Sequence, residues 1–344
     1  MSGVRNRSEG FGALPRLLDE TAKTAGEWLA ALPEREVKAA ASAEELREAL
    51  GGPLNEEGEL AADVLRNFAH AAERGLVASP GPRYFGFVTG GALPASLAAD
   101  WLTSAWDQNA VLFVSSPAAS VAEEVVASWL LDLLGFPADA SVGLVTGCQM
   151  ANFTCLAAAR HEVLRKAGWD VEADGLCGAP RITVAAGEEA HATLLVALRM
   201  LGLGERNVLP IPADEQGRMI PSALKEALEN VSGPLIVCLQ AGNVNSGAFD
   251  PCAELVPLAK AKGAWVHVDG AFGLWGALLP ELAAHTEGIG LADSWATDAH
   301  KWLNVPYDSG IAVVRNAAAH RASMTLKAPY FIAAPGAVRD PSQW

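Results

Sequence analysis

The chain has 344 residues, 51% of them hydrophobic, and its 25 Lys+Arg against 40 Asp+Glu give a formal net charge of −15. A chain this apolar can bury a core, which excludes general disorder, and the absence of a basic block argues against a nucleic-acid partner. No apolar run reaches the roughly 18 residues of a membrane-spanning helix, and the first residues, MSGVRNRSEGFG, lack the apolar core of a signal peptide. Five cysteines at irregular spacings form neither a disulfide framework nor a zinc pattern. We therefore expect a cytoplasmic protein with no metal, membrane or nucleic-acid partner.

Residues 1–80 have a helical pattern. Apolar residues recur at helical spacing from Leu17 to Leu32, and Ser42 precedes two acids as a helix N-cap does. A further amphipathic helix is expected over residues 56–74, ending at Gly75. Since these apolar faces are small, we expect residues 1–80 to pack on a partner subunit, in a homodimer.

From about residue 121 onward, helices and short apolar strands alternate. Helices are expected over residues 121–136, 151–167, 191–201, 221–230 and 252–262, and strands over 142–146, 181–185, 207–211, 235–239, 264–269, 294–298 and 310–315. Continuous apolar strands separated by helices indicate an α/β fold whose mostly parallel sheet is covered on both faces.

Ligands of such sheets bind outside the carboxyl ends of the strands. One expected strand runs into Thr146-Gly-Cys-Gln and then a helix, which would present backbone N–H groups to an anion such as phosphate. The turn is neither a P-loop nor a GxGxxG motif. It could also be a simple strand–helix connection.

Three further residues follow strands. A buried Asp269 needs a cationic partner, although it could instead cap a turn. Lys301, withdrawn from water, could act as a nucleophilic amine that forms a Schiff base, although most lysines are simply exposed. His191 opens a helix and could be an aromatic plate or a structural residue. Together with the phosphate turn, these residues match the anchors of a pyridoxal phosphate site.

The segments HVDGAFG from His267 and DAHKWL from Asp298 resemble the group II pyridoxal-phosphate-dependent amino-acid decarboxylases, which include aromatic-amino-acid, histidine and glutamate decarboxylases. In that family an H-V-D-A-A-[FY] segment precedes an [ND]-x-H-K-W segment by about 30 residues. The resemblance covers the chain from about residue 55 onward. Weaker matches to family segments begin at Pro82 (PRYFGF), Thr146 (TGCQMAN), Glu188 (EEAHAT) and Gly242 (GNVNSGAFDP).

The resemblance implies a fold-type-I pyridoxal phosphate enzyme that decarboxylates an L-amino acid to the amine and CO₂. It implies that Lys301 carries the cofactor as a Schiff base, Asp269 pairs with the ring nitrogen, His191 stacks on the ring and Tyr330 donates a proton. Tyr330 could also be a packing residue. Further contacts are implied for the cofactor from Gly147, Cys148, Gln149, Asn243, Ala271, Asp298 and His300, and for the substrate from Tyr84, Phe85 and Phe87.

Departures from the family pattern leave the substrate open. Cys148, Gln149 and Asn243 replace the usual glycine and hydroxyl residues, and Gly270 replaces an alanine, which would leave room beside the cofactor ring. Transamination, oxidative deamination, desulfuration or a catalytically silent binding subunit remain alternatives.

Residues 81–344 are expected to form the cofactor-binding large domain, and the small C-terminal domain of the family is expected to be missing.

Overall fold

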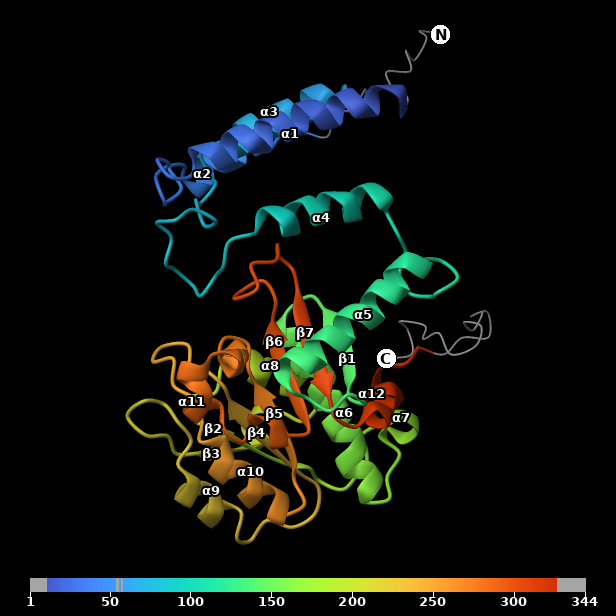
Figure 1. Ribbon diagram of the computed structural model, residues 1–344, viewed down its shortest axis with the longest axis vertical. Coiled ribbons are helices and arrows are strands. Elements are labelled where there is room, and N and C mark those ends of the chain that lie inside the picture. The colour runs from blue at the N-terminus through green and yellow to red at the C-terminus, as the bar shows by residue number, and fades with distance from the viewer. Residues whose placement is uncertain (1–10, 54–55, 57, 327–344) are drawn as a thin grey trace. The chain divides into compact units, whose positions relative to one another are not determined.

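The computed structural model describes residues 11–53, 56 and 58–326 (Figure 1). The chain divides into two compact units, residues 1–91 and 92–344, and each is described here by itself. Tyr330 lies outside the described residues.

The first unit is helical, as its sequence pattern predicts. Its elements are η1 (Phe11–Ala13), α1 (Leu14–Ala31), α2 (Ala43–Leu50) and α3 (Ala61–Glu73). The expected N-cap is confirmed, because the Ser42 Oγ accepts the Glu45 N–H and the Glu45 carboxylate accepts the Ser42 N–H. The expected start of the third helix at residue 56 is wrong. Gly58 has φ +70°, a left-handed conformation that no α-helix contains, so α3 begins only after it.

The second unit alternates helices and strands. Its helices are α4 (Pro94–Trp106), α5 (Pro117–Leu134), α6 (Cys148–Lys166), α7 (Val171–Asp174), α8 (Ala192–Met200), η2 (Glu205–Asn207), α9 (Pro221–Ala227), α10 (Cys252–Ala261), η3 (Leu274–Leu278), η4 (Pro280–Leu282), α11 (Ala283–Thr286), η5 (Ile289–Leu291) and α12 (Ala317–Met324). Its strands are β1 (Ser141–Val145), β2 (Thr183–Gly187), β3 (Val208–Ile211), β4 (Leu235–Gln240), β5 (Trp265–Asp269), β6 (Ser294–Asp298) and β7 (Gly310–Val314).

The seven strands form one sheet in the order β1-β7-β6-β5-β4-β2-β3. All pairs from β3 to β6 are parallel, whereas β7 runs antiparallel to both β6 and β1. The carboxyl ends of the six other strands therefore share one edge of the sheet with the amino end of β7. This arrangement confirms the expected α/β fold with a mostly parallel sheet.

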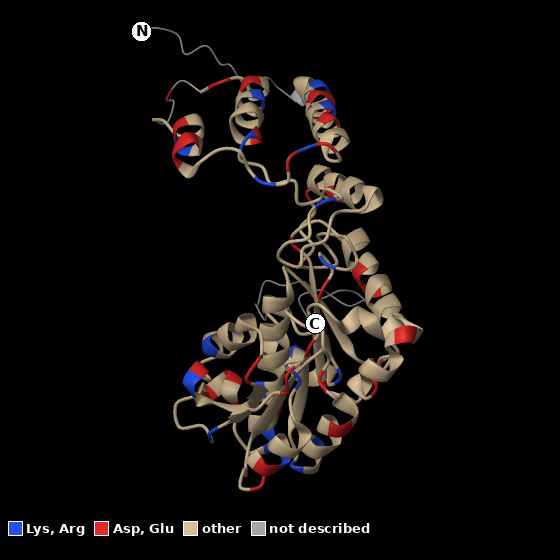
Figure 2. Ribbon diagram, turned by 90° about the vertical axis from the view of Figure 1, so that its left-hand side faces the viewer, with Lys and Arg blue, Asp and Glu red and all other residues tan. Residues whose placement is uncertain are grey.

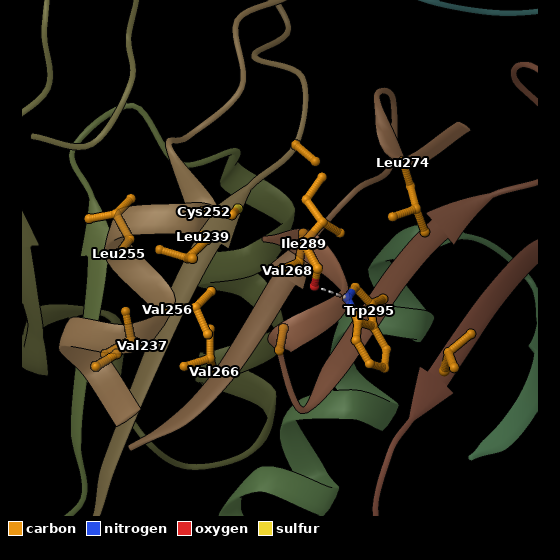
Figure 3. Close-up of a cluster of buried hydrophobic side chains, with 14 of the residues drawn as sticks. Val237, Leu239, Cys252, Leu255, Val256, Val266, Val268, Leu274, Ile289 and Trp295 are labelled. Carbon is orange, nitrogen blue, oxygen red and sulfur yellow. Dashed lines mark hydrogen bonds between the residues drawn. The ribbon is translucent and has the colours of Figure 1, made fainter. Parts of the chain in front are cut away.

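Alternate residues of each strand enter two separate cores. On β4, Val237 and Leu239 pack with α9 and α10, whereas Ile236 and Cys238 pack with α6 and α8. Figure 3 shows part of the first core, in which the Trp295 indole N–H donates to the Ile289 carbonyl at 2.9 Å. Each large side chain buried there contributes about 1.5–3 kcal/mol, so the sheet is held from both faces.

Several helix starts differ from those expected. Helix α5 begins at Pro117 rather than residue 121, because proline suits the first helical position, where no N–H bond is needed. Helix α6 begins at Cys148 rather than residue 151, so Cys148 and Gln149 belong to its first turn. Helices α4 and α12 were not expected; the Asn316 side chain caps α12 by accepting the Ala318 and Ala319 N–H groups.

Charged residues of both signs are interspersed along the helices and loops (Figure 2). Among the described residues, no helix combines the length and the apolar character needed to cross a bilayer.

A pH-dependent contribution to stability is expected from Asp250, a buried carboxyl whose two oxygens accept the Met219 and Gln240 N–H groups, each at 2.7 Å. Burial raises its pKa to about 6 from the ordinary 3.8. The folded chain then holds this proton more tightly than the unfolded chain, so the contribution of Asp250 to stability falls as pH rises from about 4 to 6 and is constant above that range.

We expect the difference in free energy of unfolding between the wild type and Asp250→Asn to change by about 2 kcal/mol between pH 4.5 and 7.5, since asparagine does not titrate. Denaturant unfolding of both proteins from pH 4.5 to 7.5 measures it. A difference that is the same at every pH would contradict the prediction.

Candidate active site

Four strand ends bring the candidate residues to the shared edge of the sheet. Lys301 follows β6, Asp269 ends β5, His191 follows β2, and Cys148 opens the helix after β1. Each therefore lies at the edge where ligands bind in such sheets, outside the carboxyl ends of the parallel strands.

Asp298 is the centre of one set of contacts. It ends β6 and is 3% exposed. One of its oxygens accepts the Cys148 N–H at 2.6 Å and lies 3.2 Å from His300 Nε2, and the other lies 2.8 Å from Lys301 Nζ. A single buried carboxylate thus holds both the lysine and the first residue of α6.

The orientation of His300 follows from its neighbours. Its Nδ1 accepts the Ser309 N–H at 3.1 Å, and its ring stacks on Tyr307 with 4.0 Å between centroids. Burial lowers its pKa, outweighing the opposite effect of Asp298, and the nearby Lys301 lowers it further. A neutral His300 then carries its proton on Nε2 and donates it toward Asp298.

Asp269 is the second buried carboxylate and is 4% exposed. Its Oδ2 accepts the Asn152 side-chain N–H at 3.0 Å, and its Oδ1 accepts the Ala271 N–H at 3.1 Å. The Cys148 thiol also lies 3.5 Å from Oδ1, and burial raises the pKa of that thiol well above its ordinary value. Cys148 is therefore a neutral donor that touches both carboxylates, one through its backbone and one through its sulfur.

A cavity at the ends of β2, β4 and β5 is lined in part by His191, Leu194, Gln240 and Asp269. His191 is the N-cap of α8, and its Nδ1 accepts the Thr193 N–H at 3.3 Å and lies 2.7 Å from the Thr193 hydroxyl. This leaves the Nε2 of a neutral His191 protonated. Asp269 and His191 thus share one cavity, and Cys148 joins Asp269 to the Lys301–Asp298 pair.

Three other predicted residues have different surroundings. Gln149 is exposed in the first turn of α6. Asn243 is 4% exposed, and its Oδ1 is occupied by the Asn245 and Ser246 N–H groups of its own turn. Ala271 contributes its backbone N–H to Asp269 rather than a side chain.

The expectation that Gly270 leaves room beside a ring is wrong. A Cβ at this position would lie 2.7 Å from the Leu274 Cβ and 3.2 Å from the Ala296 carbonyl oxygen. Glycine is present because its neighbours already fill the space.

The predicted substrate-binding residues lie in the first unit. Phe85 and Phe87 are 93% and 92% exposed within the described chain, and Tyr84 is half-buried. They stay predictions, as does Tyr330. Sequence reasoning missed the contact of Asn152 with Asp269, although Asn152 is the last residue of the TGCQMAN segment that resembles the family pattern.

The family is shown by comparison with known proteins. Residues 44–344 match the model of the pyridoxal-dependent decarboxylase conserved domain. The chain belongs to this family, the group II pyridoxal-phosphate-dependent decarboxylases, whose members bind pyridoxal phosphate.

Individual relatives differ in their substrates. The chain is 33% identical over 239 residues to an aromatic-L-amino-acid decarboxylase of Bacillus atrophaeus, covering 68% of this chain and 48% of the relative. It is 35% identical over 231 residues to an L-2,4-diaminobutyrate decarboxylase of Rhizobium meliloti, covering 66% and 44%. The chain spans about half the length of these curated relatives.

Solved structures agree on the fold. TDC of Oryza sativa, crystallised with PLP and tryptamine, superposes with a TM-score of 0.88 at 23% identity, over 98% of this chain and 71% of that one. Mouse CSAD gives a TM-score of 0.86 at 23% identity, with the same two coverages of 98% and 71%.

The contact between β7 and the turn before α6 gives a test of this edge. A Cβ on Gly310 would lie 2.8 Å or less from three backbone atoms of Gly147, so Gly310→Ala must displace the turn that presents α6. We expect a loss of about 1–3 kcal/mol of stability, measured by denaturant unfolding. Gly290→Ala, where a Cβ meets nothing within 4 Å, is the control and should be nearly neutral. Equal stabilities for the two variants would contradict the packing described.

Proposed function

We propose that the chain decarboxylates an L-amino acid to the corresponding amine and CO₂, with pyridoxal phosphate held by Lys301. The observation that carries the proposal is the contact network at the sheet edge. Lys301 pairs with Asp298, Asp298 and Asp269 both contact Cys148, and Asp269 lines a cavity with His191.

The residues present fit the cofactor. Lys301 offers an amine whose side chain is 21% exposed, and Asp269 offers a buried carboxylate toward a cation such as a protonated ring nitrogen. The first turn of α6 offers backbone N–H groups besides that of Cys148, which donates to Asp298, since its N-cap Gly147 has no side chain to occupy them. The phosphate would be held there, by the turn that includes Cys148 and Gln149.

Asp298 has a different role in this proposal from the direct cofactor contact that the resemblance implies. Its carboxylate carries the same sign of charge as a phosphate, and it already accepts the Cys148 N–H. We therefore assign it to orientation, because it fixes the Lys301 amine and the start of α6. His300, which donates toward the same carboxylate, would support that position.

Pyridoxal phosphate, when bound, supplies an electron sink for the electron pair that the departing carboxyl group leaves at the α-carbon. The residues of the chain hold the cofactor and orient it. Asp269 would hold the ring nitrogen as an ion pair, and His191 would cover one face of the ring with its Nε2–H directed away from Thr193. Tyr330 is proposed to return a proton to the α-carbon.

We assign residues 1–80 to a helical segment that packs on a second copy of the chain and residues 81–344 to the cofactor-binding large domain. Within the described part of the first unit, α1, α2 and α3 bury no residue, and Phe68 is 60% exposed, which supports a homodimer. All five cysteines are free, which suits a protein of the reducing cytoplasm.

Tyr84, Phe85 and Phe87 are proposed to contact the side chain of the amino-acid substrate.

Replacing the lysine tests the cofactor assignment. We expect the wild type mixed with pyridoxal phosphate to gain a visible absorbance band, and Lys301→Ala to lack it, because the amine that bonds to the cofactor is gone. Lys225→Ala, which removes an exposed lysine of α9, is the matched control and should keep the band. Persistence of the band in Lys301→Ala would overturn the assignment.

The reaction is tested by its products. A panel of L-amino acids, including aromatic, acidic and diamino acids, is incubated with the cofactor-loaded protein, and amine, CO₂, aldehyde and ammonia are measured. We expect equal amounts of amine and CO₂ from at least one of them. Formation of aldehyde with ammonia, or transfer of the amino group to a keto acid, would show that the chain catalyses another reaction instead of decarboxylation. Bound cofactor without any turnover would indicate a binding subunit.

A further inference from the structure

A line of buried polar side chains leads away from Asp269 into the space between the sheet and α6. The Trp265 indole nitrogen lies 2.9 Å from the Ser294 hydroxyl, which lies 3.0 Å from His267 Nδ1. His267 Nε2 lies 2.8 Å from the Asn152 amide oxygen, and the Asn152 amide nitrogen lies 3.0 Å from Asp269 Oδ2. None of the five side chains is more than 4% exposed, so water cannot replace these contacts.

The direction of every hydrogen bond in this line follows from its two ends. An ionised Asp269 only accepts, so Asn152 must turn its NH₂ group toward it and its oxygen toward His267. That oxygen also only accepts, so His267 must carry a proton on Nε2. At the other end the Trp265 indole only donates, which leaves the Ser294 hydroxyl proton for His267 Nδ1. Each group therefore donates to the next, from Trp265 to Asp269.

The line is fully paired only while His267 is neutral. A charged His267 would bear a proton on Nδ1 as well, and the Ser294 hydroxyl could then no longer donate to that atom. The structure keeps this ring neutral, because complete burial lowers the pKa of His267 to about 4 despite the opposing effect of Asp269. The ring therefore stays neutral at physiological pH.

Polar groups buried so deeply destabilise a core unless each is paired, and apolar residues of similar volume would pack at less cost. The residues come from three elements: Trp265, His267 and Asp269 from β5, Ser294 from β6, and Asn152 from α6. They meet at Asp269, whose carboxylate also lines the cavity. Their arrangement thus serves the orientation of Asp269 rather than packing alone.

We propose that Trp265, Ser294, His267 and Asn152 are positioning residues that form a one-way hydrogen-bond relay, which orients the Asp269 carboxylate toward the cavity. The inference rests on the proposed function in one respect, that Asp269 faces the ring nitrogen of pyridoxal phosphate. Asn152 occupies one lone pair of Asp269 Oδ2 and leaves the other free, whereas Oδ1 accepts from the Ala271 N–H and the Cys148 thiol.

The first test removes the final donor. Asn152→Leu keeps the approximate volume and deletes the N–H that reaches Asp269. We expect pyridoxal phosphate, titrated by absorbance, to bind about tenfold more weakly, in line with the loss of one hydrogen bond to a charged group. The binding of inorganic phosphate, measured as a thermal shift, should change less than about twofold, because phosphate uses the start of α6 and not Asp269.

Thr154→Val is the matched control. Thr154 lies on the same helix, is 0% exposed, and its hydroxyl has no partner among the described residues. This variant should bind both probes as the wild type does. If Asn152→Leu binds pyridoxal phosphate as tightly as the wild type, or loses both probes equally, the relay is refuted.

The second test measures the protonation state and tautomer of His267 in the absence of the cofactor. In full-length wild-type protein labelled with ¹⁵N-histidine, with His267→Gln used to assign the signals, we expect a neutral His267 protonated on Nε2 from pH 5.5 to 8.5. A charged ring or an Nδ1–H form would overturn the relay even if pyridoxal phosphate binds. If the wild type fails to bind pyridoxal phosphate, the proposed function fails, and the state of His267 alone then decides the relay.

Discussion

Two buried carboxylates at one edge of the sheet constrain the rest of this structure. Asp269 and Asp298 are 4% and 3% exposed, and a charge so far from water is stable only when specific partners surround it. Helix α6 supplies partners to both, through the Cys148 N–H and the Asn152 side chain. The packing of α6 against β5 and β6 is therefore a condition for these two charges, as well as a source of hydrophobic stabilisation.

The two carboxylates have different partners, and this difference defines the site. Asp298 is paired with a cation of the chain itself, Lys301, and its charge is compensated within the fold. Within the part of the chain that the structure describes, the donors to Asp269 are all neutral, namely Asn152, Ala271 and the Cys148 thiol, and they do not neutralise a carboxylate charge. A carboxylate in that condition, on the wall of a cavity, suits a cationic ligand group. For this reason we propose that Asp298 holds the lysine and that Asp269 holds the cofactor ring.

The sequence predicted the fold and the strand-end motifs well, because parallel strands bring their carboxyl ends together whatever the strand order. It did not predict the antiparallel β7, since pairing order depends on contacts between distant segments. The relay behind Asp269 was also missed. Asn152 and His267 are 115 positions apart, so their contact could not be read from the two family segments that contain them. Gly270 was misread because Leu274, whose Cβ leaves no space for another, could not be placed from the sequence.

In the proposed site, one particular lysine holds pyridoxal phosphate at this edge of the sheet. Borohydride reduction of the protein mixed with pyridoxal phosphate, followed by peptide mass spectrometry, tests it most directly, because reduction makes the bond between lysine and cofactor permanent. We expect a single phosphopyridoxyl group on the peptide that contains Lys301. A label spread over exposed lysines such as Lys225, with Lys301 unmodified, would contradict it.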